Sequence, residues 1–131
     1  MDLNLLNHRL AICRLEPGVR TPEWAISAGG FSAITRTAGE LSIVSAASTV
    51  PPGVQCEAGW RAFKIAGPLD FALTGILASI AVPLAAAGVS IFAISTYDTD
   101  YVLVKENKVE EAVRALEKAG HRVEVAISDD N

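Results

Sequence analysis

Residues 71–95 read FALTGILASIAVPLAAAGVSIFAIS, and no charged side chain interrupts the chain between Phe71 and Tyr97. Length alone would allow a transmembrane helix, which needs about 20 consecutive apolar residues. Pro83 and Gly88 interrupt the stretch, however, and no Lys or Arg lies immediately beside it, as such residues do beside membrane helices. We therefore predict a buried helix followed by a buried strand, and no membrane span.

Leucine and isoleucine recur at helical spacing in the first part of this stretch. The stripe consists of Leu73, Ile76, Leu77, Ile80 and Leu84. Asp70 is a candidate N-cap and Gly88 a candidate terminator of the helix. The opposite face consists of Ala, Ser and Thr, which suits close packing against a second domain or subunit. After Gly88, VSIFAIST is rich in β-branched and aromatic residues, which favours a strand buried on both faces.

The neighbouring segments complete a recognisable order. We predict strands at 60–66, 101–104 and 123–127, and a helix at 109–118 that ends at Gly120. Together with the helix and strand of the apolar stretch, this gives the order β-α-β-β-α-β across residues 60–127. That order is typical of the α+β ferredoxin-like fold.

The N-terminal half carries a shorter version of the same plan. It contains a predicted strand at 10–15, one or two helical turns at 22–26, and a hairpin formed by 31–37 and 41–47. An offset of 60 residues aligns this hairpin with the later one, placing Ile34 on Ile94 and Glu40 on Asp100. With residues 50–59 as the junction, we predict two related domains, 1–58 and 59–131, of which the first is degenerate.

Composition excludes several classes of protein. Half of the 131 residues are hydrophobic, a fifth are charged, and the net charge is −4, so a globular chain without a basic nucleic-acid surface is expected. The N-terminal residues lack a secretory pattern, which predicts a cytoplasmic protein. Cys13 and Cys56 lie far apart in the sequence and are expected to be reduced thiols.

The second half of the chain resembles the ACT-domain family. The motif is GPLDFALTGILAS followed by AGVSIFAISTYDTDYVLV, and the resemblance covers residues 60–127 well and 8–58 more loosely. It is closest to small tandem-ACT proteins related to aspartokinase regulatory domains and to CASTOR-type arginine sensors. The resemblance implies that an amino acid binds at a seam between two ACT domains, either within one chain or between the subunits of a homodimer.

In this family the ligand touches the loop after the first strand, the start of the first helix and the end of the second strand. Carried onto this chain, the predicted ligand-binding residues are Gly67, Pro68, Leu69, Asp70, Thr74, Gly75, Ile76, Leu77, Ser95, Thr96, Tyr97, Asp98 and Asp100. The N-terminal half has no GPLD-like loop and no full first helix, so one site per chain is expected.

The residues themselves support this site but also have other roles open to them. A helix N-terminus suits an α-carboxylate, and Gly75 would let a ligand approach the backbone. Asp70, Asp98 and Asp100 could receive an α-ammonium group. Alternatively, Asp70 is only an N-cap and the other two carboxylates only shape a turn. Gly75 could serve helix packing, and Tyr97 could be an ordinary strand residue.

Other chemistries have weaker signals. Asp98 and Asp100 form a DxD pair without further metal ligands nearby, and His8 and His121 show no metal-ligand spacing. The sequence contains no phosphate-binding loop, dinucleotide fingerprint or nucleophile elbow. We therefore expect a non-catalytic regulatory protein with no cofactor and no metal. The alternative is an ACT-fold interaction module that binds no ligand, and a small enzyme using the three aspartates is a third possibility.

Overall fold

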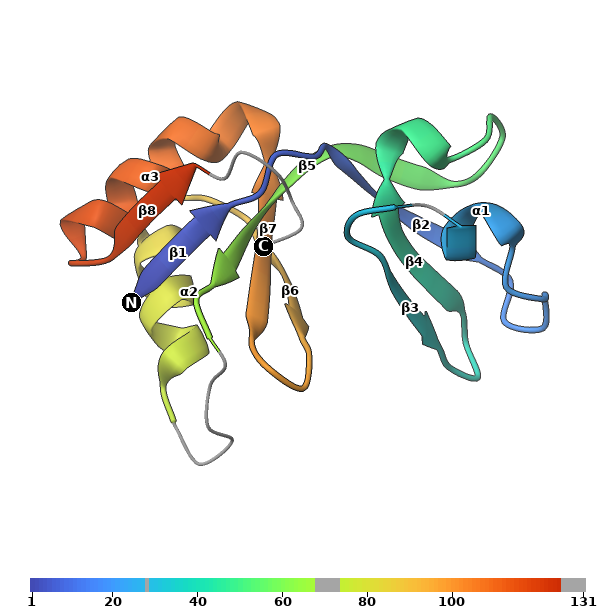
Figure 1. Ribbon diagram of the computed structural model, residues 1–131, viewed down its shortest axis with the longest axis horizontal. Helices are drawn as coiled ribbons and strands as arrows, with labels where there is room; N and C mark the ends of the chain where they lie inside the picture. The colour runs from blue at the N-terminus through green and yellow to red at the C-terminus, as the bar shows by residue number, and fades with distance from the viewer. Residues whose placement is uncertain (28, 68–73, 126–131) are drawn as a thin grey trace. The chain divides into compact units, whose positions relative to one another are not determined.

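The structure of the protein is a computed structural model that describes residues 1–27, 29–67 and 74–125 (Figure 1). It divides into two units. The inserted unit is His8–Trp60, and the C-terminal unit joins Met1–Asn7 to the chain from Arg61 onward. The predicted domains, 1–58 and 59–131, differ from this grouping because Met1–Asn7 belongs with the C-terminal unit. One unit thus lies within the sequence of the other.

The C-terminal unit contains a sheet with the strand order β6-β7-β5-β1-β8. Its elements are β1 (Asp2–Leu5), β5 (Cys56–Ile65), α2 (Ile76–Ala86), β6 (Phe92–Ser95), β7 (Asp100–Lys105), η2 (Glu106–Lys108), α3 (Val109–Lys118) and β8 (Arg122–Val125). From β5 onward the order is β-α-β-β-α-β, so the predicted ferredoxin-like arrangement is confirmed. The sequence did not predict β1, which pairs antiparallel with β5 and parallel with β8, and so separates them.

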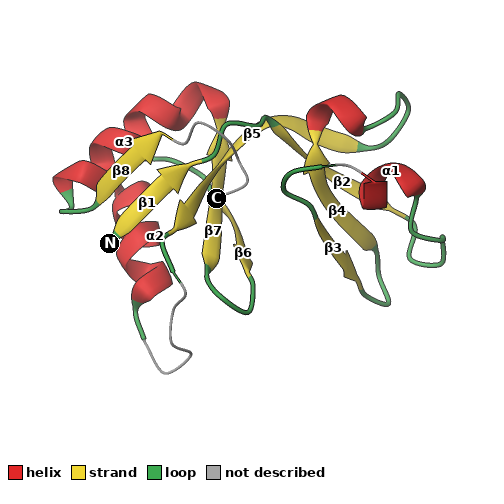
Figure 2. Cartoon of the chain, in the orientation of Figure 1, coloured by secondary structure: helices red, strands yellow, loops and turns green. Residues whose placement is uncertain are grey.

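Both long helices of this unit cover the same face of its sheet, as Figures 1 and 2 show. Ile80 and Leu84 of α2 and Leu116 of α3 are fully buried in the cluster formed with the sheet. The strands contribute alternate residues to the same cluster, which are Leu3, Leu5, Phe63, Ile65, Val102 and Val104. The predicted stripe therefore faces the sheet from Ile76 to Leu84, while Ala78, Ser79 and Val82 are exposed and Leu73 lies outside the described residues.

Helix α2 begins later than predicted. Gly75 is its N-cap and adopts the left-handed conformation with φ of 75°, so Asp70, which lies outside the described residues, is not the cap. The predicted end is confirmed: Gly88 is left-handed, its N–H donates to the Ala85 carbonyl, and the Val89 N–H donates to the Leu84 carbonyl. These two bonds form a Schellman motif, which satisfies carbonyls at the helix end.

The inserted unit repeats the plan with shorter helices. Its elements are β2 (Leu10–Leu15), α1 (Glu23–Ser27), β3 (Ala33–Arg36), β4 (Leu41–Ala46), η1 (Ala47–Thr49) and the first part of β5. Its strand order is β3-β4-β2-β5, and the neighbouring pairs are antiparallel. The strands near 10–15, 31–37 and 41–47 are thus confirmed, with helix α1 at 23–27, but β5 begins within the predicted junction.

The repeat is real, but its offset is 59 residues rather than 60. Hairpin pairing matches Arg36 with Leu41 in the inserted unit and Ser95 with Asp100 in the C-terminal unit. The same offset carries β3 onto β6, β4 onto β7 and η1 onto η2. The sequence alignment was one residue out because it matched apolar residues, whereas the turn geometry fixes the register. The chain segment that corresponds to α3 forms no helix in the inserted unit.

Strand β6 is not buried on both faces: its residues alternate between half-buried and exposed, since it pairs with β7 at the end of the strand order. In the part of the chain that the structure describes, no helix is long and apolar enough to cross a membrane.

Candidate functional site

The described parts of the predicted site segments lie at one end of the C-terminal unit (Figure 1). Strand β5 ends at Ile65, α2 begins at Ile76, and the β6–β7 turn lies at the same end of the sheet (Figure 1). Gly67 is exposed just beyond β5. Pro68, Leu69 and Asp70 lie outside the described residues.

Two threonines shape the β6–β7 turn. The Thr96 N–H donates to the Thr99 carbonyl at 2.8 Å, and the Thr96 hydroxyl donates to the same carbonyl at 3.1 Å. The Thr99 N–H in turn donates to the Thr96 hydroxyl at 3.3 Å. These bonds leave Tyr97 and Asp98 at the tip. Thr37 and Glu40 make the corresponding bonds in the β3–β4 turn.

Thr99 also connects this turn to β5. Its side chain is buried, and its hydroxyl donates to the Ile65 carbonyl at 2.6 Å. The bond holds the turn beside the last residue of β5, two residues before Gly67. Thr99 is not among the predicted site residues, although it stands between two of them, Asp98 and Asp100.

The carboxylates of the turn have different environments. The Ser95 hydroxyl donates to the Asp100 carboxylate at 2.5 Å across the paired strands, so Asp100 already has a partner within the hairpin. Asp98 is exposed at the tip, and Tyr97 beside it is 81% exposed. Asp98 is therefore the more accessible of the two carboxylates.

Asp98 also acts electrostatically on a tyrosine. Burial raises the pKa of Tyr101, and the negative charge of Asp98 raises it further. The Lys64 ammonium lies 6.0 Å from the centre of the Tyr101 ring, at the outer limit of a cation–π contact. Because Phe63 and Val102 point into the core, Lys64 and Tyr101 point to the opposite face of the sheet.

The start of α2 offers backbone donors. The first N–H groups of a helix have no acceptor within the helix, and the positive end of the helix dipole lies there. The side chains of Ile76 and Leu77 pack against the core, so these two residues could serve a ligand through their backbone only. Thr74 and Gly75 are exposed, and a Cβ added to Gly75 would meet nothing within 4 Å.

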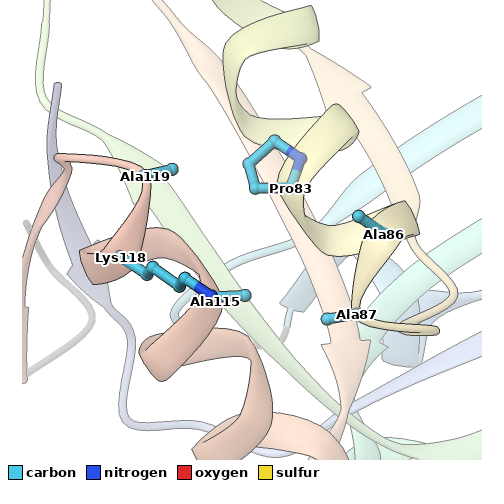
Figure 3. Close-up of a pocket in the computed structure, with 6 residues that line it drawn as sticks. All are labelled: Pro83, Ala86, Ala87, Ala115, Lys118 and Ala119. Carbon is cyan, nitrogen blue, oxygen red and sulfur yellow. The ribbon is translucent and has the colours of Figure 1, made fainter.

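A separate hollow lies elsewhere in this unit. It has a volume of about 330 Å³ and lies between the C-terminal halves of α2 and α3 (Figure 3). Its lining residues are Pro83, Ala86, Ala87, Ala115, Lys118 and Ala119. None of these belongs to the predicted site.

Metal binding finds no support among the residues that the structure describes, since no three His, Cys, Asp or Glu side chains gather there. His121 has a structural contact instead. Its Nε2 lies 2.8 Å from the Ser79 carbonyl and its Nδ1 lies 3.1 Å from the Met1 nitrogen. The imidazole thus donates to the carbonyl through Nε2–H and accepts from Met1 through Nδ1.

Both halves of the chain match models of known protein families. A model of the ACT domain matches residues 55–118, and a second family model, of an N-terminal domain, matches residues 8–53. Residues 55–118 belong to the ACT-domain family. Its mixed sheet with helices on one face is the ferredoxin-like ACT fold, and the predicted family resemblance is confirmed.

Among curated proteins, this ACT protein is similar to the cytosolic arginine sensor for mTORC1 subunit 1. The Pongo abelii relative is 35% identical over an alignment of 113 positions, which covers 76% of this chain and 34% of the relative. The human relative is 43% identical over 60 residues, which are 45% of this chain and 18% of the relative. The chain thus spans about a third or less of the length of these relatives.

Two solved structures are similar to the ACT protein as a whole. A crystal structure from Agrobacterium tumefaciens is 41% identical, covers 95% of this chain and 92% of its own, and has a TM-score of 0.90. The regulatory subunit of aspartate kinase from Thermus thermophilus is 15% identical, covers 88% of this chain and 94% of its own, and has a TM-score of 0.60. The second likeness shows the fold alone.

Proposed function

We propose that the protein is a non-catalytic regulator that binds an amino acid through the β6–β7 turn and the start of α2. The similarity that carries this proposal is the 35% identity to an arginine sensor over an alignment of 113 positions, because this stretch is longer than the ACT match and must include part of the inserted unit. Arginine is therefore the first ligand to test.

The chemistry of the described residues supports a zwitterionic ligand. The N–H groups at the start of α2 suit an α-carboxylate. Asp98 is exposed at the neighbouring turn and can receive an ammonium or guanidinium group, with which a carboxylate forms charge-assisted hydrogen bonds. The Thr99–Ile65 bond holds that turn beside the end of β5.

The amino acid would regulate the protein by binding one of its conformations more tightly than another. A ligand shifts a conformational equilibrium only by the difference between its affinities for the two states. We propose that the seam with an ACT domain of a second subunit provides these states, in a cytoplasmic homodimer that needs no cofactor. Light scattering should accordingly give the mass of a dimer, and a monomer at all concentrations would contradict this part of the proposal.

Thermal unfolding with single amino acids tests the central proposal. A ligand present at about 100 times its Kd stabilises the folded state by about 2.7 kcal/mol, which raises the melting temperature by several degrees. We expect arginine, or one of the other amino acids, to produce such a rise. A flat response to the whole set would favour the alternative of an interaction module without a ligand.

Asp98→Asn then locates the site. The variant should lose the ligand-dependent rise and keep the melting temperature of the free protein, since Asp98 is exposed. Glu40→Gln is the matched control, because Glu40 is an exposed carboxylate in the corresponding turn of the inserted unit. Full ligand response in Asp98→Asn, or equal loss in both variants, would contradict the proposed site.

A further inference from the structure

The structure brings together two cysteines that the sequence keeps far apart. Cys13 lies on β2, Cys56 is the first residue of β5, and the two are direct partners across the antiparallel pair of strands. Both belong to the inserted unit. Both are free thiols in the structure, as expected, but they are neighbours across the strand pair.

The position of this pair within the ladder favours close side chains. The Arg14 N–H donates to the Gln55 carbonyl at 2.9 Å, which makes Arg14 and Gln55 a hydrogen-bonded pair. Because such pairs alternate with non-hydrogen-bonded pairs, Cys13 and Cys56 form one of the latter, with Cα atoms about 4.5 Å apart. Disulfides span Cα separations of about 4.4 to 6.8 Å. The backbone thus already meets the distance requirement.

The two thiols have different access to solvent. Cys13 is 2% exposed and packs with Ala25, Leu41 and Ile43, whereas Cys56 is exposed. Burial raises the pKa of the Cys13 thiol to about 11, and Cys56 adds to the rise through its charge and a hydrogen bond between the side chains. Of the two paired thiols, Cys56 is therefore open to reagents and Cys13 is protected.

We propose that Cys13 and Cys56 form a reversible disulfide that responds to low-molecular-weight disulfides such as oxidised glutathione. In reducing compartments such bonds are usually transient and redox-sensing. The exposure of Cys56 leaves the bond accessible to reductants as well as to oxidants. This inference does not depend on amino-acid binding.

The reaction proceeds in two exchanges. The Cys56 thiolate attacks one sulfur of oxidised glutathione, its disulfide breaks, and one glutathione leaves as a thiolate that takes up a proton. Cys13 then loses its proton to solvent and attacks the Cys56 sulfur, and the second glutathione leaves. The two protein thiols lose two electrons in total, and one glutathione disulfide is reduced to two glutathione thiols.

The new bond would stabilise the inserted unit. It would link the end of β2 to the start of β5, and the closed loop would contain α1, β3, β4 and η1. Closing a loop of this length restricts the unfolded chain and should raise the melting temperature by about 5 to 15 °C.

The experiment uses the full chain equilibrated in glutathione buffers from reducing to oxidising. Intact mass after alkylation of free thiols should show loss of both thiols with no glutathione attached, and peptide mapping should join Cys13 to Cys56. The melting temperature should rise with the oxidised fraction and return after dithiothreitol. A lasting glutathione adduct on Cys56, a bond between chains, or two free thiols under oxidising conditions would overturn the proposal.

Two variants complete the test. Cys56→Ser changes an exposed residue, so it should fold normally, show no rise in melting temperature on oxidation, and keep Cys13 unmodified. Cys13→Ala should hold glutathione on Cys56, since no second thiol remains to displace it. A rise in melting temperature in the oxidised Cys56→Ser variant equal to that of the unmodified chain would also overturn the proposal.

Discussion

Thr99 shows how one buried hydroxyl can organise exposed neighbours. Its side chain is 4% exposed, while Tyr97 and Asp98 just before it are exposed at the tip of the turn. The hydroxyl donates to the Ile65 carbonyl, and the Thr99 N–H and carbonyl bond with Thr96. The residue thus fixes both the shape of the turn and its place beside β5, without being accessible to a ligand.

Thr99→Val should separate this positioning role from simple packing. Valine keeps the shape but leaves the Ile65 carbonyl without its donor, which costs about 1 to 3 kcal/mol in a buried place. We expect a lower melting temperature and a weaker response to the amino acid that binds. Thr99→Ser, which keeps the hydroxyl, should retain most of the ligand response. Equal loss of response in both variants would contradict the role of the hydroxyl.

At the residue scale the sequence could predict local roles but not distant partners. Gly88 and Gly120 were predicted to end helices because the signal lies within a few residues, and both are left-handed as expected. The partner of Thr99 lies 34 residues away, and the partner of Cys13 lies on another strand. Such contacts depend on strand register, which a single sequence does not reveal. The predicted ligand-binding role of Asp98 remains a prediction.

Among the elements, α2 has an internal proline and an unusual compensation for it. Pro83 has no N–H, so the Ser79 carbonyl, four residues earlier, lacks its usual helical donor. His121, which follows α3, donates to that carbonyl through Nε2 at 2.8 Å. The same imidazole accepts from Met1, so it also connects α2 to the start of β1. The Ser79 carbonyl, which Pro83 leaves without a helical donor, is thus satisfied by a residue between α3 and β8.

A double-mutant cycle on Pro83 and His121 tests this compensation. His121→Ala should lower the free energy of unfolding by about 1 kcal/mol, the usual net contribution of one hydrogen bond. In the Pro83→Ala background, residue 83 can donate to Ser79 itself, so His121→Ala should cost distinctly less. Denaturant unfolding of the four proteins gives the coupling. The same cost in both backgrounds would mean that His121 acts through Met1 alone.

The elements also show where sequence patterns lose information. The Leu and Ile stripe correctly placed the body of α2 and its buried face, because burial acts on each turn of the helix. The predicted start of α2 was wrong. Asp70 was the predicted N-cap, but the N-cap is Gly75, which adopts the left-handed conformation. The β6 strand was predicted to be fully buried from its composition, but its place at the end of the strand order leaves alternate residues exposed.

At the scale of the whole molecule, the presence of two units could be predicted from the sequence. The assignment of β1 to the C-terminal unit could not. Each unit carries its own local pattern, so a ferredoxin-like unit and a shorter version of the same plan could be recognised. The place of β1 depends on pairing with β5 and β8, the latter more than a hundred residues later in the chain. The sequence DLNL does not itself show whether this strand belongs to the inserted unit, which follows it directly in the chain, or to the C-terminal unit.

The insertion of one unit into the other leads to a prediction about fragments. Leu3 and Leu5 on β1 are 0% and 5% exposed within the C-terminal core. Loss of a buried leucine side chain typically costs 2 to 5 kcal/mol, and the total stability of a domain is about 5 to 15 kcal/mol. A fragment of residues 56–131, which keeps all of β5, should therefore fail to unfold cooperatively by circular dichroism.

Adding a peptide of residues 1–7 should restore the transition. Because the peptide binds only the folded fragment, the melting temperature should rise with peptide concentration. A peptide with Leu3→Asp is the matched control and should have no effect, since it would place a charge in the core. A cooperative transition in the fragment alone, unchanged by the peptide, would contradict the prediction. It would mean that β8 pairs directly with β5 when β1 is absent, and that the unit is complete without Met1–Asn7.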